Sequence, residues 1–474
     1  MGGGPERMSF AEGHAIEQRS KGDKNLRGVV DMGSNGIRFS VSSLAPPTSR
    51  ILPTLVSYRL DISLYSAQYD DETGERIPIP DDIINLIIAA LMRFRVICRD
   101  LKVPEKHIRI VATEATRTAV NSVEYRKAIK EATGLEVEML GKEEEGYVGA
   151  LGVASGFSTV SGIVMDLGGG STQITWMRST DGKVQVSPKG SISFPYGAAA
   201  LAFLVNVLTE ALPHGIKEAH FCQGGVREGV LFRELPQDVR DEDPLEVATQ
   251  NYGRKSADAL SSLLLNSIPT TSKKDGGRAF PESISKHVIH AFANVLYVHA
   301  HMSKEIASTA ALYCTSSGFM ASAHGVSHSD RALLGLMLEE RYEGELPPRE
   351  ADFKLSLQSI LTPEEIWWTR YLGAVGLLIS KIYPAGNFDE DEPRIKISSE
   401  WASGFGKNDD KEGLRLTLYI KKIKNDPMML KEALNDHVGN IHKVGKHKNW
   451  IGGANGWGMS INIKIEEVQS MVQY

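Results

Sequence analysis

The chain has 474 residues, 42% of them hydrophobic and 24% charged, which is typical of a globular protein and allows two to four domains. Its net charge of −6 gives no general attraction to nucleic acid, which argues against direct nucleic-acid binding. Its three cysteines, Cys98, Cys222 and Cys314, lie far apart without metal-binding spacing and fit a reducing compartment.

Residues 1–24 are polar and contain several glycines, which predicts a disordered segment without the apolar core of a signal peptide. Glu6 also stands where a myristoylation signal needs Ser or Thr. Because the longest apolar stretches, residues 83–92 and 372–379, are too short to span a bilayer, we expect no membrane association. These features predict a cytoplasmic protein and leave the nucleus open.

Residues 25–158 alternate between strand and helix patterns, which indicates an α/β lobe with a central mixed sheet. Pro80, Asp81 and Asp82 mark the start of one helix, in which apolar residues repeat with a helical period. The other expected elements are strands at 29–32, 37–44, 51–58, 108–112 and 135–140 and helices at 121–132 and 143–153.

The strand pattern restarts at Ser161, which predicts a second, shorter lobe over residues 159–240. We expect two strands joined by a glycine turn, extended structure over 184–194, a helix over 198–211 and a short strand over 219–222. Residues 241–385 then read as a helical domain and residues 386–474 as a small α+β domain. The expected elements there are helices at 245–265, 284–303, 330–342, 363–383 and 428–438, and strands at 394–397, 414–420 and 459–465.

Two glycine-bearing turns, far apart in the chain, each follow an aspartate at the end of an expected strand. Such strand–turn–strand units direct backbone N–H groups into the turn, where an anion can bind, and glycine lets a phosphate approach closely. The candidate phosphate-binding residues are Asp31, Gly33, Ser34, Asn35 and Arg38 in the first turn and Gly168, Gly169, Gly170, Ser171 and Thr172 in the second. The matched pair suggests a duplicated fold that holds a polyanion from both sides.

The two leading aspartates are candidate magnesium ligands. Asp31 and Asp166 could hold Mg²⁺ directly or through water, because this ion favours carboxylates together with phosphate oxygens. The alternative is that each carboxylate caps its own turn with an Asx hydrogen bond. The presence of two matched aspartates favours the metal.

Arginines and an acidic run supply the other groups that phosphoryl transfer needs. Arg38 and Arg117 could each pair with two phosphate oxygens, although either alone reads equally as a surface residue. The run 143–145 begins an expected helix between the two turns. One of its glutamates could act as a base toward water, or the whole run could be solvated and simply favour the helix dipole. His287 and His290 share a helix face and are interpreted as structural.

With these motifs the chain resembles the Ppx/GppA family of exopolyphosphatases and guanosine pentaphosphate phosphatases, within the actin-like ATPase superfold. The matching segments are residues 31–38, 112–117 with Asn121, 144–145 with Gly152, 166–172 and 225–231. The resemblance implies α/β architecture with two actin-like (ribonuclease H-like) lobes, followed by an HD-like helical domain that lacks the metal-binding dipeptide. It also implies that Glu145 is the catalytic base, that Arg117 assists catalysis and that Gly224 and Gly225 contact phosphate.

Two departures from the family pattern bear on these expectations. Gly146 replaces the usual alanine after a third glutamate, so Glu144 remains an alternative to Glu145. Few residues separate Leu201 from Phe221, where the family has far more, so contacts from the second lobe to a nucleotide base are in question.

Residues 222–229, 323–331 and 344–349 are similar to the fungal retrograde regulation protein 2 subgroup of that family. The subgroup implies a phosphate- or nucleotide-binding regulator of mitochondria-to-nucleus signalling that acts through a regulatory protein partner; a dimer is left open. The alternative is an active exopolyphosphatase or guanosine pentaphosphate phosphohydrolase that uses a glutamate base and Mg²⁺. The expected ligand is ATP, polyphosphate or a guanosine polyphosphate.

Overall fold

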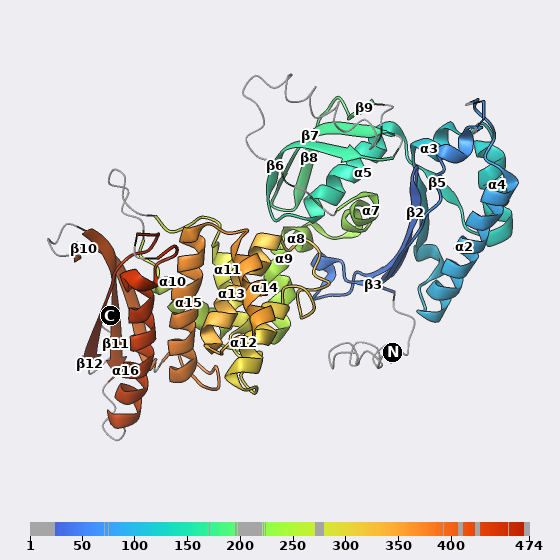
Figure 1. Cartoon of the computed structure of the whole chain (residues 1–474). Helices are drawn as coiled ribbons and strands as arrows, with labels where there is room; N and C mark the ends of the chain where they lie inside the picture. The colour runs from blue at the N-terminus through green and yellow to red at the C-terminus, as the bar shows by residue number, and fades with distance from the viewer. Residues whose placement is uncertain are drawn as a thin grey trace. The chain divides into compact units, whose positions relative to one another are not determined.

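The computed structural model describes residues 24–70, 72–73, 75–169, 171–194, 197, 220, 222, 224–270, 279–391, 393–405, 411–421, 427–453 and 455–468. The helix expected at 198–211 and the disordered segment expected at 1–24, apart from Lys24, lie outside these residues, as do two of the four residues of the strand expected at 219–222. The chain divides into two compact units, Met1–Glu242 and Asp243–Tyr474 (Figure 1).

The first unit begins with a five-stranded mixed sheet, in the order β3-β2-β1-β4-β5. Its strands are β1 (Leu26–Gly33), β2 (Gly36–Ser43), β3 (Thr54–Leu60), β4 (Ile108–Ala112) and β5 (Val137–Met139). The first three pair antiparallel, whereas β4 and β5 run parallel to β1. The strand expected at 51–58 starts later, because Ile51 belongs to a 3₁₀ turn and Leu52 has a φ of 45° just before Pro53.

Helices cover both faces of this sheet, so its strands are apolar on both sides. One face packs against α2 (Asp81–Asp100) and α4 (Ser122–Thr133), where Val30 and Phe39 share a core with Phe94. The other face contacts α7 (Val226–Glu234), which packs on α5 (Lys142–Ser155), and there Val29 belongs to a different core from Val30. The short α3 (Glu114–Thr118) follows β4 directly.

The second sheet of this unit repeats the antiparallel opening of the first. Its strands are β6 (Val160–Leu167), β7 (Thr172–Thr180), β8 (Lys183–Val186) and β9 (Ile192–Phe194), and β7 pairs antiparallel with each of the others. Val164 and Met177 join the same core as α5 and α7 (Val226–Glu234), which α8 (Gln237–Asp241) follows. One hydrophobic core therefore connects the two sheets through α5 and α7 (Figure 1).

Helices α5 and α7 approach so closely that their backbones touch at glycines. A Cβ on Gly229 would lie 2.0 Å from the Val148 carbonyl oxygen, and one on Gly152 would lie 2.2 Å from the Gly225 carbonyl oxygen. Any side chain at these positions would force the helices apart. Glycine is thus required here for helix packing, and the packing fixes where the N-terminus of each helix points.

A buried arginine fixes the other end of α5. Arg50 is fully buried and donates hydrogen bonds to the carbonyl oxygens of Ser155 at 2.9 Å and Phe157 at 3.0 Å. It also donates to the carbonyls of Arg240 and Glu242, at 3.2 and 3.0 Å. Because a buried charge is tolerated only when its hydrogen bonds are satisfied, these four carbonyls explain why Arg50 can lie inside the fold.

The second unit begins with helices and ends with a three-stranded sheet. The helices are α9 (Pro244–Thr249), α10 (Ala257–Asn266), α11 (Lys286–Val295), α12 (Lys304–Tyr313), α13 (His328–Tyr342), α14 (Pro348–Gln358) and α15 (Pro363–Ile382). The sheet has the order β10-β11-β12, formed by Ile395–Phe405, Lys411–Lys421 and Ile461–Val468, with α16 (Pro427–Val444) between β11 and β12. No helix among the described residues combines the length and apolar character that crossing a membrane requires.

Most of the expected elements of this unit are present, but several bounds differ. The helix expected at 284–303 ends at Val295, and the strand expected at 394–397 extends to Phe405. The helix expected at 245–265 is divided, because the 3₁₀ turn Gln250–Tyr252 separates α9 from α10. The pattern also missed α12 and α14, and it made α16 too short. The long α15 matches its expected range, because Thr362 caps it and its apolar residues are buried on all sides.

Replacing Gly229 with alanine should destabilise the first unit by about 1–3 kcal/mol, because the new Cβ would overlap the Val148 carbonyl oxygen. Hydrogen-exchange mass spectrometry of peptides from α5 and α7 measures this loss of protection. Gly162→Ala is the matched control, because a Cβ at Gly162 meets nothing within 4 Å. Equal protection in both variants would show that the α5–α7 contact does not hold this unit together.

Candidate functional site

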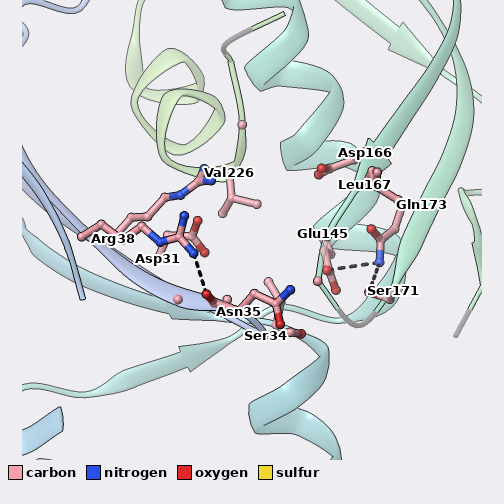
Figure 2. Close-up of a pocket in the computed structure, with 17 residues that line it drawn as sticks. Asp31, Ser34, Asn35, Arg38, Glu145, Asp166, Leu167, Ser171, Gln173 and Val226 are labelled. Atoms are coloured by element: carbon pink, nitrogen blue, oxygen red, sulfur yellow. Dashed lines mark hydrogen bonds between the residues drawn. The ribbon is translucent and has the colours of Figure 1, made fainter. Parts of the chain in front are cut away.

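The two glycine turns face each other across a pocket in the first unit (Figure 2). In the first, Asp31 on β1 pairs with Arg38 on β2, and in the second, Asp166 on β6 pairs with Gln173 on β7. The turns also touch, since a Cβ on Gly169 would lie 2.3 Å from the amide carbon of Asn35. The duplicated hairpins therefore place both aspartates at one pocket.

Most of the candidate phosphate-binding residues line this pocket. The lining comprises Asp31, Gly33, Ser34, Asn35, Gly36, Arg38, Arg59, Thr113, Glu145, Asp166, Leu167, Gly168, Gly169, Ser171, Gln173, Gly225 and Val226. Thr172 is instead fully buried, and Gly224 packs against the backbone of Gly152. Gly170 lies outside the described residues.

Of the three glutamates that begin α5, Glu145 reaches the pocket. Its side chain is 7% exposed, and its two oxygens accept hydrogen bonds from Arg117 Nη2 at 2.9 Å and from Gln173 Nε2 at 3.2 Å. Glu144 points elsewhere and forms an ion pair with Arg233 at 3.1 Å. Consecutive side chains of an α-helix point about 100° apart around its axis, so only one of these two glutamates can face the pocket.

Arg117 lies behind Glu145 and does not line the pocket. Its guanidinium donates to Glu145 and to Glu114 Oε2, the latter at 2.5 Å, and also to the Leu140 carbonyl. These bonds occupy the fork that would otherwise meet a phosphate. In this structure Arg117 therefore holds the Glu145 carboxylate in place, and Arg38 is the predicted arginine that lies at the pocket itself.

Three carboxyl groups give the pocket an acidic side: Glu145 is buried, and Asp31 and Asp166 are partly buried. Burial raises the pKa of Glu145 to about 7, against the opposing effect of Arg117, and it raises the pKa of Asp31 to about 6, against the opposing effect of Arg38. Burial also raises the pKa of Asp166, again opposed by Arg38. Ionisation of any of these carboxyl groups is therefore unfavourable here unless a further positive charge is present.

Sequence reasoning missed Arg59 and Gln173 as lining residues. Gln173 follows Asp166 by the same interval at which Arg38 follows Asp31, so the repeat itself carried a signal for it. Its amide donates to Ser171 Oγ at 2.9 Å as well as to Glu145, which joins the second turn to α5. Arg59 lies at the pocket because the register of β3 against β2 pairs it with Arg38.

No group of three or more His, Cys, Asp and Glu side chains within the described residues is arranged to hold a metal ion. At the pocket, the residues suited to share one are Asp31 and Asp166, which come from opposite turns. The histidines of the second unit interact with acidic side chains: His287 Nδ1 lies 2.7 Å from Glu246 and His290 Nε2 lies 2.8 Å from Asp258. These contacts agree with the structural interpretation of the two histidines.

Each half of the chain matches a known protein family or domain. Residues 47–204 match the Ppx/GppA phosphatase family, and residues 243–468 match the RTG2 C-terminal domain. Retrograde regulation protein 2 of Saccharomyces cerevisiae is 31% identical over 494 aligned positions, which cover 78% of this chain and 82% of that protein.

Solved structures of similar proteins are more distant. An exopolyphosphatase from Cytophaga hutchinsonii is 22% identical over 38% of this chain, with a TM-score of 0.31, and the chain spans about half of it, 53%. The Aquifex aeolicus PPX-GPPA enzyme is 21% identical over 66% of this chain and 93% of its own length, with a TM-score of 0.32. By its identity to the yeast protein over most of both chains, this chain belongs to the Ppx/GppA phosphatase family, in the group of retrograde regulation protein 2.

Proposed function

We propose that this protein is a regulator of mitochondria-to-nucleus signalling whose pocket binds a magnesium complex of polyphosphate or of a nucleoside polyphosphate, such as ATP or guanosine pentaphosphate. The observation that carries this proposal is the pair of aspartate-led turns that meet at one pocket with Arg38 between their carboxylates. Membership of the retrograde regulation protein 2 group supports the signalling role. A cytoplasmic location, a regulatory protein partner and a dimer belong to the same proposal.

The two sheets of the first unit correspond in this proposal to actin-like lobes, over residues 25–158 and 159–240. Residues 241–385 correspond to an HD-like helical domain without its metal site, and residues 386–474 form the α+β domain. The repeated antiparallel hairpin and the shared helix α5 support the duplicated lobes.

The shortness of the second lobe favours recognition through phosphates. The match to the Ppx/GppA model ends at residue 204, inside this lobe. Fewer residues remain to hold a nucleotide base, whereas both phosphate turns are present.

The pocket fits Mg²⁺ through the chemistry of its donors. Asp31 and Asp166 present partly buried carboxylates from opposite turns, and their raised pKa values mark a site that lacks positive charge when both are ionised. Mg²⁺ bound there would neutralise both the carboxylates and the phosphate oxygens. Arg38, which lies close enough to lower both pKa values, would orient the phosphate.

The second candidate function is hydrolysis of a phosphoanhydride. Glu145 lies at the pocket, held by Arg117 and Gln173, and its pKa of about 7 suits a general base that accepts a proton from water. In this reading Arg117 assists catalysis by fixing the base. The retained base supports an active enzyme, whereas the group membership supports a sensor.

Asp166→Asn should weaken binding of tripolyphosphate at least tenfold in the presence of Mg²⁺, because one of two carboxylate ligands is lost. In EDTA the same variant should bind the bare anion as well as or better than the wild type, since a negative charge is removed. Calorimetric titration measures both affinities, with Asp181→Asn on the exposed β7–β8 turn as the control. Equal affinities of variant and wild type with Mg²⁺ would contradict the proposed metal site.

Release of phosphate from polyphosphate separates the enzyme from the sensor. If Glu145 is the base, wild-type turnover should rise as the pH passes through about 7, because the carboxyl must be ionised. Glu145→Ala should then lower turnover by a hundredfold or more. Equal, near-zero release by both proteins would reject the enzyme and leave the sensor.

Glu145→Gln should stabilise the fold more at pH 8.5 than at pH 5.5. A carboxyl whose folded pKa lies near 7, above its ordinary 4.5, favours folding at low pH and loses that contribution as the pH rises through 7. The neutral amide avoids this loss, so the gain across the range should be on the order of 1–3 kcal/mol. Urea unfolding at the two pH values measures it; a gain independent of pH would show that Glu145 titrates normally.

A further inference from the structure

A row of charged side chains crosses the first sheet from the pocket to its rim. Asp31 on β1 lies opposite Arg38 on β2, and Arg38 lies opposite Arg59 on β3. Directly paired residues point to the same face of a sheet, with Cβ atoms roughly 5 Å apart. All three side chains line the pocket, so two cations stand next to each other beside the partly buried aspartate.

This pairing of like charges is unfavourable unless an anion separates them. Arg59 has one acidic partner in the described residues, Asp61, at 2.9 Å from Nε. Asp61 is 84% exposed, and ion pairs this exposed contribute little to stability and exchange readily with water. Arg59 is therefore poorly compensated within the protein, whereas Arg38 lies beside Asp31 and Asp166.

The second sheet has no such row. There the equivalent residues are Asp166 on β6, Gln173 on β7 and Ser193 on β9, which pair in the same manner. An aspartate is thus followed by two neutral residues where the first sheet has two arginines. The difference gives the pocket one cationic side, and that side runs outward along β2 and β3.

The position of Arg59 sets where a phosphate would meet it. Its guanidinium lies against the first turn, donating to the Asn35 carbonyl at 2.7 Å, and a Cβ on Gly36 would lie 2.7 Å from Arg59 Nε. Its side chain is 49% exposed, and that of Arg38 is exposed as well. Arg59 therefore lies at the open rim of the pocket, on the edge strand β3 next to Arg38.

We infer that Arg59 binds an outer phosphate of a linear polyphosphate, so that the site selects chains of three or more phosphates over pyrophosphate. The inner phosphates occupy the turns beside Arg38, and the chain leaves the pocket across Arg59. Asp61 competes with that phosphate for the guanidinium. This inference rests on the proposed function and names the ligand class of the same site.

Calorimetric titration with pyrophosphate and tripolyphosphate, at fixed Mg²⁺ and ionic strength, tests the inference. Wild type should bind tripolyphosphate at least tenfold more tightly than pyrophosphate. Arg59→Gln should lose most of that ratio while its affinity for pyrophosphate stays within about twofold. Asp61→Asn should increase the ratio, because the competing carboxylate is gone, and Arg59→Lys should retain part of it.

Arg99→Gln is the matched control, because Arg99 is 77% exposed and its carboxylate partner lies 3.9 Å away. The inference would be overturned if Arg59→Gln kept the wild-type ratio of tripolyphosphate affinity to pyrophosphate affinity. It would also be overturned if Arg59→Gln and Arg99→Gln weakened the binding of both ligands equally. Either result would leave the proposed function intact. A wild-type chain that binds neither ligand would overturn the proposed function itself, and the inference with it. Thermal unfolding of Arg59→Lys and Arg59→Gln separates a loss of binding from a loss of fold.

Discussion

The contact between the backbones of α5 and α7 is the constraint on which the first unit depends. Glycines at 152, 225 and 229 let the two helices touch, and the core that surrounds this contact reaches both sheets. Because close-packed cores transmit small displacements, a spacer as small as a methyl group would move one sheet relative to the other. Arg50 holds the C-terminal end of α5 through the Ser155 and Phe157 carbonyls. The middle and the C-terminal end of the helix that carries Glu145 are therefore fixed before any ligand binds.

The same packing explains the electrostatics of the pocket. It brings Asp31 and Asp166 from opposite sheets to one pocket that Glu145 also lines, so that ionised Asp166 raises the pKa of both Asp31 and Glu145. Arg38 and Arg117 offset only part of this increase, since all three pKa values remain raised. A site of this kind is stabilised by whatever brings positive charge, either protons or a metal ion. The stability of the ligand-free site therefore depends on pH, and that of the ligand-bound site depends on the metal ion.

Local sequence predicted the parts of this site that are set by local rules. Each aspartate-led turn is encoded within eight residues, and the strands around it follow from apolar patterns. Arg59 was not predicted as a site residue, because the strand expected at 51–58 ends before it. Only the observed register of β3 shows that Arg59 lies beside Arg38. Arg50 was also unpredictable, since its four carbonyl partners lie more than 100 residues away in the chain. The predicted helix boundaries in the second unit were wrong where a 3₁₀ turn interrupts an apolar pattern that continues on both sides. The turn Gln250–Tyr252 is the example.

Within the proposed function, the raised pKa of Glu145 bears on how a family of phosphatases could include a regulator. A base with a pKa of about 7 suits proton transfer near neutral pH, but in about half of the molecules it is then protonated and not ready to accept a proton from water. Slow hydrolysis prolongs the time for which a phosphate ligand occupies the turns. A partner protein reads occupancy rather than turnover, so a slow site serves signalling better than a fast one. The balance between the two roles then depends on the hydrogen bonds that Arg117 and Gln173 donate to Glu145, because these bonds favour the ionised form and set how far it is populated.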